Sequence, residues 1–243
     1  MQKKFLLFIP FLFSANFTHA STTGSVGGAS VSKDKTQIEA RFGYSEAEES
    51  SSQDERFRSR FQVDHGFTDY YAARLVIQQD RRKGDNLEHD SITFDNRFQF
   101  LDAEKSGFDL GIRAGYQHKD GDKKPSAVTF GVFERIPVDA YEIRLNQLFD
   151  HDVGEDADDG ISAEARFQVT RKLENGHRLG VEGFHDFGNL RELSGYSDQS
   201  HQIGPVAKGA LPFENMKYEV GYRAGISDAA PDHNFKLFIS RSF

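Results

Sequence analysis

Histidine, serine and aspartate residues that could form a hydrolytic site occur between residues 118 and 233. The candidates are His118, His185, Asp186, Ser200, His201 and His233. A serine, a histidine and an acid held together activate a hydroxyl nucleophile, and some small membrane barrels act on lipids in this way. The sequence contains no Gly-x-Ser-x-Gly motif. We therefore rank a lipid-acting enzyme third, after the two interpretations given below, and we expect no catalytic residues.

Basic residues give a second and stronger chemical signal, because they recur near the middle of successive polar and apolar alternations. These residues are Arg41, Arg58, Arg60, Arg74, Arg97, Arg113, Arg144, Arg166, Arg223, Lys208 and Lys236. A ring of such charges in a narrow passage focuses a positive field that attracts small anions or acidic sugars. We expect these side chains to line a channel for small anionic solutes.

Acidic residues share the same positions in the alternation and support a second interpretation. They are Glu39, Asp64, Asp95, Asp109, Glu142, Glu164, Glu182 and Glu219. A buried guanidinium group needs an acidic or hydrogen-bonding partner, so these carboxylates could fill the interior with salt bridges. The alternative to a channel is thus a non-conducting structural or adhesive protein with a salt-bridged interior.

Both interpretations require elements that place charged and apolar side chains on opposite faces. Residues 108–117 show the pattern: Phe108, Leu110 and Ile112 alternate with Asp109 and Arg113. A period of two is typical of a β-strand, and the three- and four-residue spacing of a helix is missing. About twelve such segments follow one another between residues 36 and 243, an even number as in bacterial transmembrane barrels.

The connections between these segments alternate in length. Tight turns are expected at 66–69, 102–107, 137–139, 174–177 and 212–215, and longer polar loops at 46–54, 79–89, 118–126, 150–160, 188–200 and 227–234. Short periplasmic turns on one rim and longer extracellular loops on the other are typical of outer-membrane barrels. We therefore predict an all-β fold: a transmembrane, antiparallel, up-and-down β-barrel. The expected number of strands is about twelve, within a range of about 10–14.

The two ends of the chain indicate export. Residues 1–20 combine Lys3 and Lys4 with an apolar run and a small residue at Ala20, which predicts a signal peptide. The Gly- and Ser-rich residues 21–35 predict a flexible periplasmic lead-in, and 36–243 a single barrel domain. The last residues, 235–243, alternate and end in Phe243. They resemble the C-terminal strand of bacterial outer-membrane proteins, and this resemblance implies recognition of Phe243 by the barrel-assembly machinery.

Composition excludes several classes of function. With 30 basic against 38 acidic residues and a net charge of −8, the chain lacks the basic excess of a nucleic-acid-binding protein. With no cysteine it has neither disulfides nor thiolate metal sites. The acidic stretches 46–55 and 150–160 are interpreted as solvated loops, with divalent-cation binding at 150–160 as the alternative. We expect no metal and no cofactor.

Together these observations predict a location in the bacterial outer membrane. Twelve strands with a basic lining are similar in architecture to the small acidic-oligosaccharide channels of that membrane. The expected partners are outer-membrane lipid and lipopolysaccharide, the assembly machinery and a small solute, with no nucleic acid.

Overall fold

A computed structural model describes residues 22–121 and 125–243 of the chain. The predicted signal peptide at residues 1–20 lies outside the described residues. Within the described ranges, no helix is long and apolar enough to cross a membrane.

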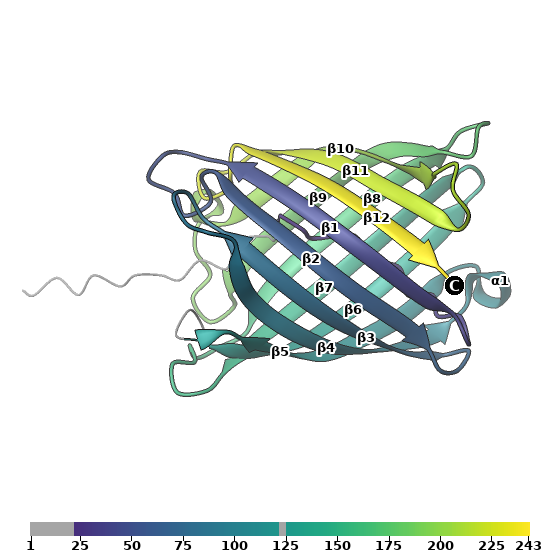
Figure 1. Cartoon of the computed structure of the whole chain (residues 1–243), viewed down its shortest axis with the longest axis horizontal. Coiled ribbons are helices and arrows are strands. Elements are labelled where there is room, and N and C mark those ends of the chain that lie inside the picture. Colours follow the sequence, from purple (N-terminus) through teal and green to yellow (C-terminus); the bar gives the residue numbers. More distant parts are fainter. Residues whose placement is uncertain (1–21, 122–124) are drawn as a thin grey trace, which may run out of the picture.

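Twelve antiparallel strands close into a barrel in which each strand pairs with its neighbours in sequence and β12 returns to β1 (Figure 1). The strands are β1 (Thr36–Glu46), β2 (Arg56–Gly66), β3 (Tyr71–Arg81), β4 (Glu88–Leu101), β5 (Asp109–Lys119), β6 (Ser126–Val138), β7 (Tyr141–Val153), β8 (Ser162–Lys172), β9 (Arg178–Asn189), β10 (Ser200–Ala210), β11 (Met216–Gly225) and β12 (His233–Ser242). The all-β transmembrane barrel fold expected from the alternation is confirmed.

Closure of the barrel depends on the C-terminal strand. β12 pairs with β1 in a register that places Phe235 opposite Tyr44 and Leu237 opposite Phe42. At the end of the ladder, the Phe243 amide donates to the Thr36 carbonyl at 2.8 Å. The terminal residue therefore completes the last backbone pairing that removes the open sheet edge, a requirement for strands surrounded by lipid.

Side chains alternate across the barrel wall with apolar groups outside. On β3 and β4 the paired residues Leu75 and Phe94 are 47% and 51% exposed, whereas Asp64 on β2 and Asp95 on β4 are buried. An apolar exterior over a polar interior is the reverse of a water-soluble protein and suits a bilayer. The apolar side chains form the outer surface of the barrel, and the inward face forms the lumen.

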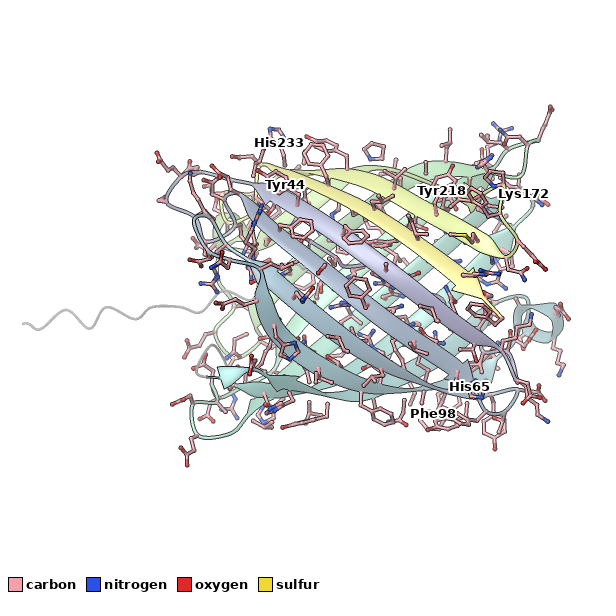
Figure 2. The ribbon with its side chains drawn as sticks, in the orientation of Figure 1. Tyr44, His65, Phe98, Lys172, Tyr218 and His233 are labelled. Atoms are coloured by element: carbon pink, nitrogen blue, oxygen red, sulfur yellow. The ribbon has the colours of Figure 1, made fainter. Side chains whose placement is uncertain are left out.

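The two rims differ as the sequence predicts. One rim, the turn rim, carries tight turns and a short helix, α1 (Ala103–Ser106), whose first turn is capped by the Asp102 carboxylate. The other, the loop rim, carries the longer connections, including the 3-10 helix η2 (Tyr196–Asp198). Figure 2 shows Tyr44 and His233 near the loop rim, and His65, Phe98 and Tyr218 near the turn rim. Aromatic side chains thus border the apolar band at both ends.

Several loops are shorter than expected because the strands continue beyond the apolar band. β3 extends to Arg81 and β7 to Val153, so 79–81 and 150–153 are strand rather than loop. Backbone pairing does not require an apolar side chain, so these hairpins continue into polar sequence where alternation gives no signal.

The N-terminal segment occupies a place that the sequence did not predict. Residues 22–33, here called the lumen segment, contact inward side chains of β1, β4, β5, β7, β8 and β9. Only the interior of the barrel lies within reach of all these strands (Figure 1). The expectation of a periplasmic lead-in is therefore corrected. The small, polar residues that suggested a linker also fit an extended chain between crowded charged groups.

Candidate functional site

The basic residues expected to line a channel lie on the inward face of the barrel. They are Arg41, Arg58, Arg60, Arg74, Arg97, Arg113, Arg144, Arg166, Arg223, Lys208 and Lys236, with salt-bridge or hydrogen-bond partners on the same face. The alternation of strands places them there, because their neighbours in sequence are outward apolar residues. That they line a conducting path stays a prediction.

Most of these basic groups form ion pairs with acidic residues of the inward face. Asp64 accepts from both Arg74 and Arg97, each at 2.9 Å. Further pairs join Glu39 to Arg41, Asp95 to Arg113, Glu164 to Arg166, Glu142 to Arg144 and Lys208, and Glu219 and Glu182 to Lys236. Lys208 on β10 reaches Glu142 on β7, so these pairs span the lumen as well as following its wall. The ion pairs fix the positions of the guanidinium and ammonium groups.

The most buried part of this network surrounds an aromatic ring. Glu182 is completely buried and accepts from Lys236 at 2.6 Å. Beside it, the Arg223 guanidinium carbon lies 3.7 Å from the centre of the Phe184 ring, and that of Arg166 lies 4.9 Å away. Cations stacked on an aromatic face gain attraction that grows when water is excluded. The β9–β12 side of the lumen is therefore tightly packed.

The turn rim contains a basic pocket, here called the vestibule, with a volume of about 520 Å³. Its charged lining residues are Lys35, Asp64, Arg97, Arg135, Arg144 and Lys217. Five of these six groups are basic, and the guanidinium groups of Arg97, Arg135 and Arg144 are partly exposed. A pocket with this charge can hold carboxylate or phosphate oxygens, because a guanidinium offers paired donors to such anions.

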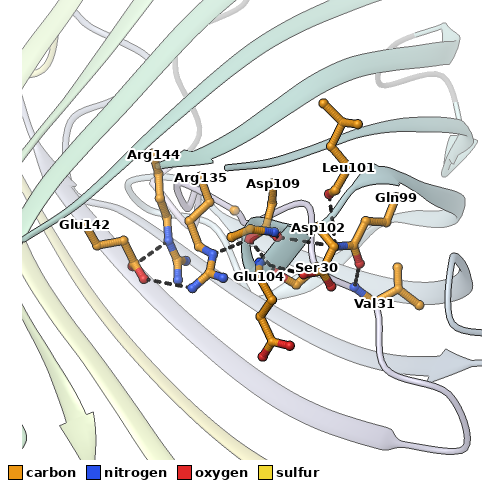
Figure 3. A network of polar contacts seen from close by, with 12 residues as sticks. Ser30, Val31, Gln99, Leu101, Asp102, Glu104, Asp109, Arg135, Glu142 and Arg144 are labelled. Carbon is orange, nitrogen blue, oxygen red and sulfur yellow. Dashed lines mark hydrogen bonds and ion pairs between the residues drawn. The ribbon is translucent and has the colours of Figure 1, made fainter. Parts of the chain in front are cut away.

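Figure 3 shows how the wall of the vestibule is held. Arg144 donates to Glu142 at 2.9 Å, and Arg135 bridges Glu142 and Asp109. Asp109 also accepts from the backbone N–H of Ala103, the first residue of α1, at 2.7 Å. This network connects the β4–β5 turn to β6 and β7 and keeps the two arginines at the pocket surface.

Sequence reasoning missed Arg135, Arg56 and the inward ring of Phe184. Arg135 lies an even number of residues from Thr129 on β6, and Arg56 an even number from Arg58 on β2. Residues separated in this way share one face of a strand, here the inward face. Strict counting of parity along the strand could have found both arginines. Phe184 was hidden because an apolar residue on the polar face breaks the simple rule of alternation.

Two glycines of the inward face lie against the lumen segment. A Cβ atom at Gly43 would come within 2.7 Å of the Thr22 backbone, and one at Gly111 would lie 3.1 Å from the Ala29 Cβ. The lumen segment fills the space that these glycines provide. Gly43 and Gly111 therefore accommodate a second stretch of backbone rather than a wider pore.

The loop rim has the opposite charge. A pocket there is lined by Glu48, Asp228 and Asp232. Two loops are joined by Lys83, which donates to Asp54 at 2.7 Å, and this hydrogen bond lowers the pKa of the Asp54 carboxyl. Among the described residues, no group of three or more histidine or acidic side chains is arranged to hold a metal ion.

The hydrolytic candidates are not assembled into a catalytic site. Ser200 and His201 are neighbours on β10 and therefore point to opposite faces, Ser200 inward and His201 outward. Outside, His201 lies 3.1 Å from His185 between their Nδ1 atoms and stacks under Tyr196 at 4.4 Å. The Asp186 carboxylate faces the lumen and accepts from the Gly188 amide. His118 and His233 bond to Ser126 and Tyr222 at the loop rim.

Comparison with known proteins gives a likeness of fold. No family model matches the sequence, and no curated protein matches it. Among solved structures, the KdgM porin superposes with a TM-score of 0.59 at 9% identity, covering 85% of this chain and 99% of that one. The COG4313 outer membrane channel from Pseudomonas putida F1 gives 0.66 at 11% identity over 90% and 100%, and the NanC porin 0.55 at 10% over 84% and 98%. The protein has the fold of small outer-membrane channels.

Proposed function

We propose that this protein is a narrow outer-membrane channel for small anionic solutes, with carboxylated sugars as the favoured class. The observation that carries the proposal is the vestibule, a polar pocket of about 520 Å³ lined by five basic groups and one acid. Asp109 and Glu142 pair with two of its arginines, and the basic groups remain in excess. A small pocket with low-dielectric walls concentrates the field of its charges and raises the local concentration of anions. The solved complex of the KdgM porin with oligogalacturonate, an acidic sugar chain, supports the same class of solute.

A non-conducting structural barrel is the second candidate, and one observation favours it. The ion pairs of the β9–β12 side and the lumen segment together fill much of the interior. A permanently filled barrel would have no use for the partly exposed guanidinium groups of Arg97, Arg135 and Arg144 at the turn rim. We therefore favour the channel.

The proposed location and partners follow from the fold. Export by a signal peptide at residues 1–20 and insertion through the assembly machinery would place the loop rim outside the cell. The outward apolar band would then contact lipid, and the loops would contact lipopolysaccharide. Catalysis has no part in the proposal.

Solute uptake by liposomes containing the purified barrel tests the function. We expect glucuronate to enter at least about tenfold faster than glucose, because the focused positive field acts on the charged sugar alone. Liposomes without protein are the control for leakage. Equal rates for the two sugars would contradict the anionic preference, and absence of uptake for both would support the structural barrel.

A further inference from the structure

The lumen segment is held by side chains of the barrel wall. The Asn146 side-chain amide binds the backbone of Gly27 in both directions, at 2.8 and 3.1 Å. Closer to the turn rim, Gln99 accepts from the Val31 amide at 2.7 Å, and Ser30 donates to Asp109 at 3.0 Å. Such bonds can be exchanged for bonds to water or solute without breaking the strand pairing of the barrel.

Three backbone carbonyls of the segment bind arginines of the inward face. Arg41 donates to the Thr23 carbonyl at 3.3 Å and to the Ser25 hydroxyl at 2.7 Å. Arg166 donates to the Ser25 carbonyl at 3.1 Å, and Arg144 to the Val26 carbonyl at 3.4 Å. These neutral oxygens accept from guanidinium N–H groups. A carboxylate would accept from the same groups in stronger, charge-assisted bonds.

Apolar contacts of the segment are few. Val26 packs on Phe184, and Ala29 packs with Phe133 and Leu148. Residues 22–32 contain no charged side chain, and the first charge is Lys33. The segment therefore lacks the ion pairs that fix the rest of the lumen, and it buries only two apolar side chains in contact with the core clusters.

The attachment of the segment lies at the turn rim. Asp34 has a positive φ of 58°, and its amide donates to the Gly66 carbonyl at 2.8 Å. The Gly66 amide in turn donates to the Lys35 carbonyl at 3.0 Å, immediately before β1 begins at Thr36. This two-bond clamp separates the barrel strand from the lumen segment and forms a pivot beside the vestibule.

We propose that the lumen segment is a displaceable plug, which anionic solute releases by taking over Arg41, Arg144 and Arg166. The proposal rests on the proposed function for the identity of the solute. In the resting barrel, the carbonyls of Thr23, Ser25 and Val26 share the three guanidinium groups with the wall carboxylates Glu39, Glu164 and Glu142. A carboxylated solute competes for those donors, and the segment swings about Asp34 toward the turn rim.

Alkylation of a buried reporter cysteine tests the displacement directly. The chain contains no cysteine, and Ala29 is buried inside the barrel, so the Ala29→Cys thiol should react slowly with a maleimide. We expect the rate to rise as glucuronate is added and to stay constant with glucose. A cysteine at the exposed loop position Ser194 is the control, and its rate should be constant with both sugars.

Two outcomes of the alkylation would overturn the plug. A slow rate at every glucuronate concentration would mean that the segment is a fixed part of the barrel. A rate equal to that of Ser194→Cys without solute would mean that the segment does not occupy the lumen. This readout needs no current, so it decides the plug even when the proposed channel fails.

A reversible crosslink tests whether the segment blocks the passage. In Ala29→Cys/Gly111→Cys the two Cβ positions are 3.1 Å apart, somewhat below the usual disulfide spacing of about 3.8 Å. We expect the oxidised variant to lose most of its glucuronate-induced current and to regain it on reduction. Gly111→Cys alone controls for crowding against the Phe98 carbonyl. Equal currents before and after reduction would show that the segment is not in the conducting path and overturn the plug.

Deletion of residues 22–32 separates failure of the plug from failure of the channel. A deletion variant with anion-selective current, combined with a crosslink that has no effect, would leave the channel intact and remove the plug. Current from the deletion variant alone, with none from the intact chain at any glucuronate concentration, would make the segment a fixed plug. Absence of current from both would contradict the proposed function.

Discussion

Glu182→Gln should lower the free energy of unfolding of the barrel by about 3 kcal/mol, because a buried ion pair loses one partner. The change keeps the shape of the side chain and removes only its charge. Glu182 is fully buried and accepts from Lys236 at 2.6 Å and from Gln168 at 3.1 Å. After the change, Lys236 retains Glu219 as its acidic partner, and Arg223 loses the carboxylate that lies 4.0 Å away.

Urea unfolding in lipid vesicles, followed by the far-ultraviolet circular dichroism of the strands, measures this effect. The control is Asp159→Asn, which removes a carboxylate that is 97% exposed and 3.8 Å from Arg191. Exposed pairs of this kind contribute little, so the control should unfold with wild type. If Glu182→Gln and wild type share one midpoint, the buried network does not stabilise the barrel.

Replacing Arg97, Arg135 and Arg144 together with Gln should convert anion selectivity into weak cation selectivity. These arginines supply three of the five basic groups of the vestibule. Their removal takes the guanidinium partner from Asp109 and leaves Glu142 with Lys208 as its basic partner. A unit charge at 4 Å contributes about 4 kcal/mol at an effective dielectric constant near 20. A tenfold change in the permeability ratio needs only about 1.4 kcal/mol.

A charge-matched control distinguishes the vestibule from the overall charge of the protein. Arg81, Arg171 and Arg191 are exposed outside the lumen. Their joint replacement with Gln removes the same net charge and should leave the permeability ratio unchanged. If both triple variants shift the ratio equally, the arginines of the vestibule do not determine selectivity.

The barrel could be predicted from sequence because its main constraint is local. Outward residues such as Leu75 and Phe94 must meet lipid, and a strand presents every second residue to one face. The alternation therefore carries both strand position and orientation. The same parity placed Arg41, Arg97 and Arg166 on the inward face without knowledge of their partners.

The contents of the lumen could not be predicted in the same way. Residues 22–33 have no periodicity, because they pair with side chains such as Asn146 and Gln99 and with no strand. Their position depends on contacts with residues far along the chain. The inward ring of Phe184 was missed for a related reason: it packs against Val26, a partner that alternation does not reveal.

The central claim is that the lumen is an anion-selective passage, and the zero-current potential across a planar bilayer measures it most directly. Wild-type protein is placed between concentrated and dilute potassium chloride, with glucuronate present on both sides. We predict a potential of the sign given by chloride and glucuronate crossing faster than potassium. A potential of the opposite sign, or no current from either the intact chain or the chain without residues 22–32, would contradict the account.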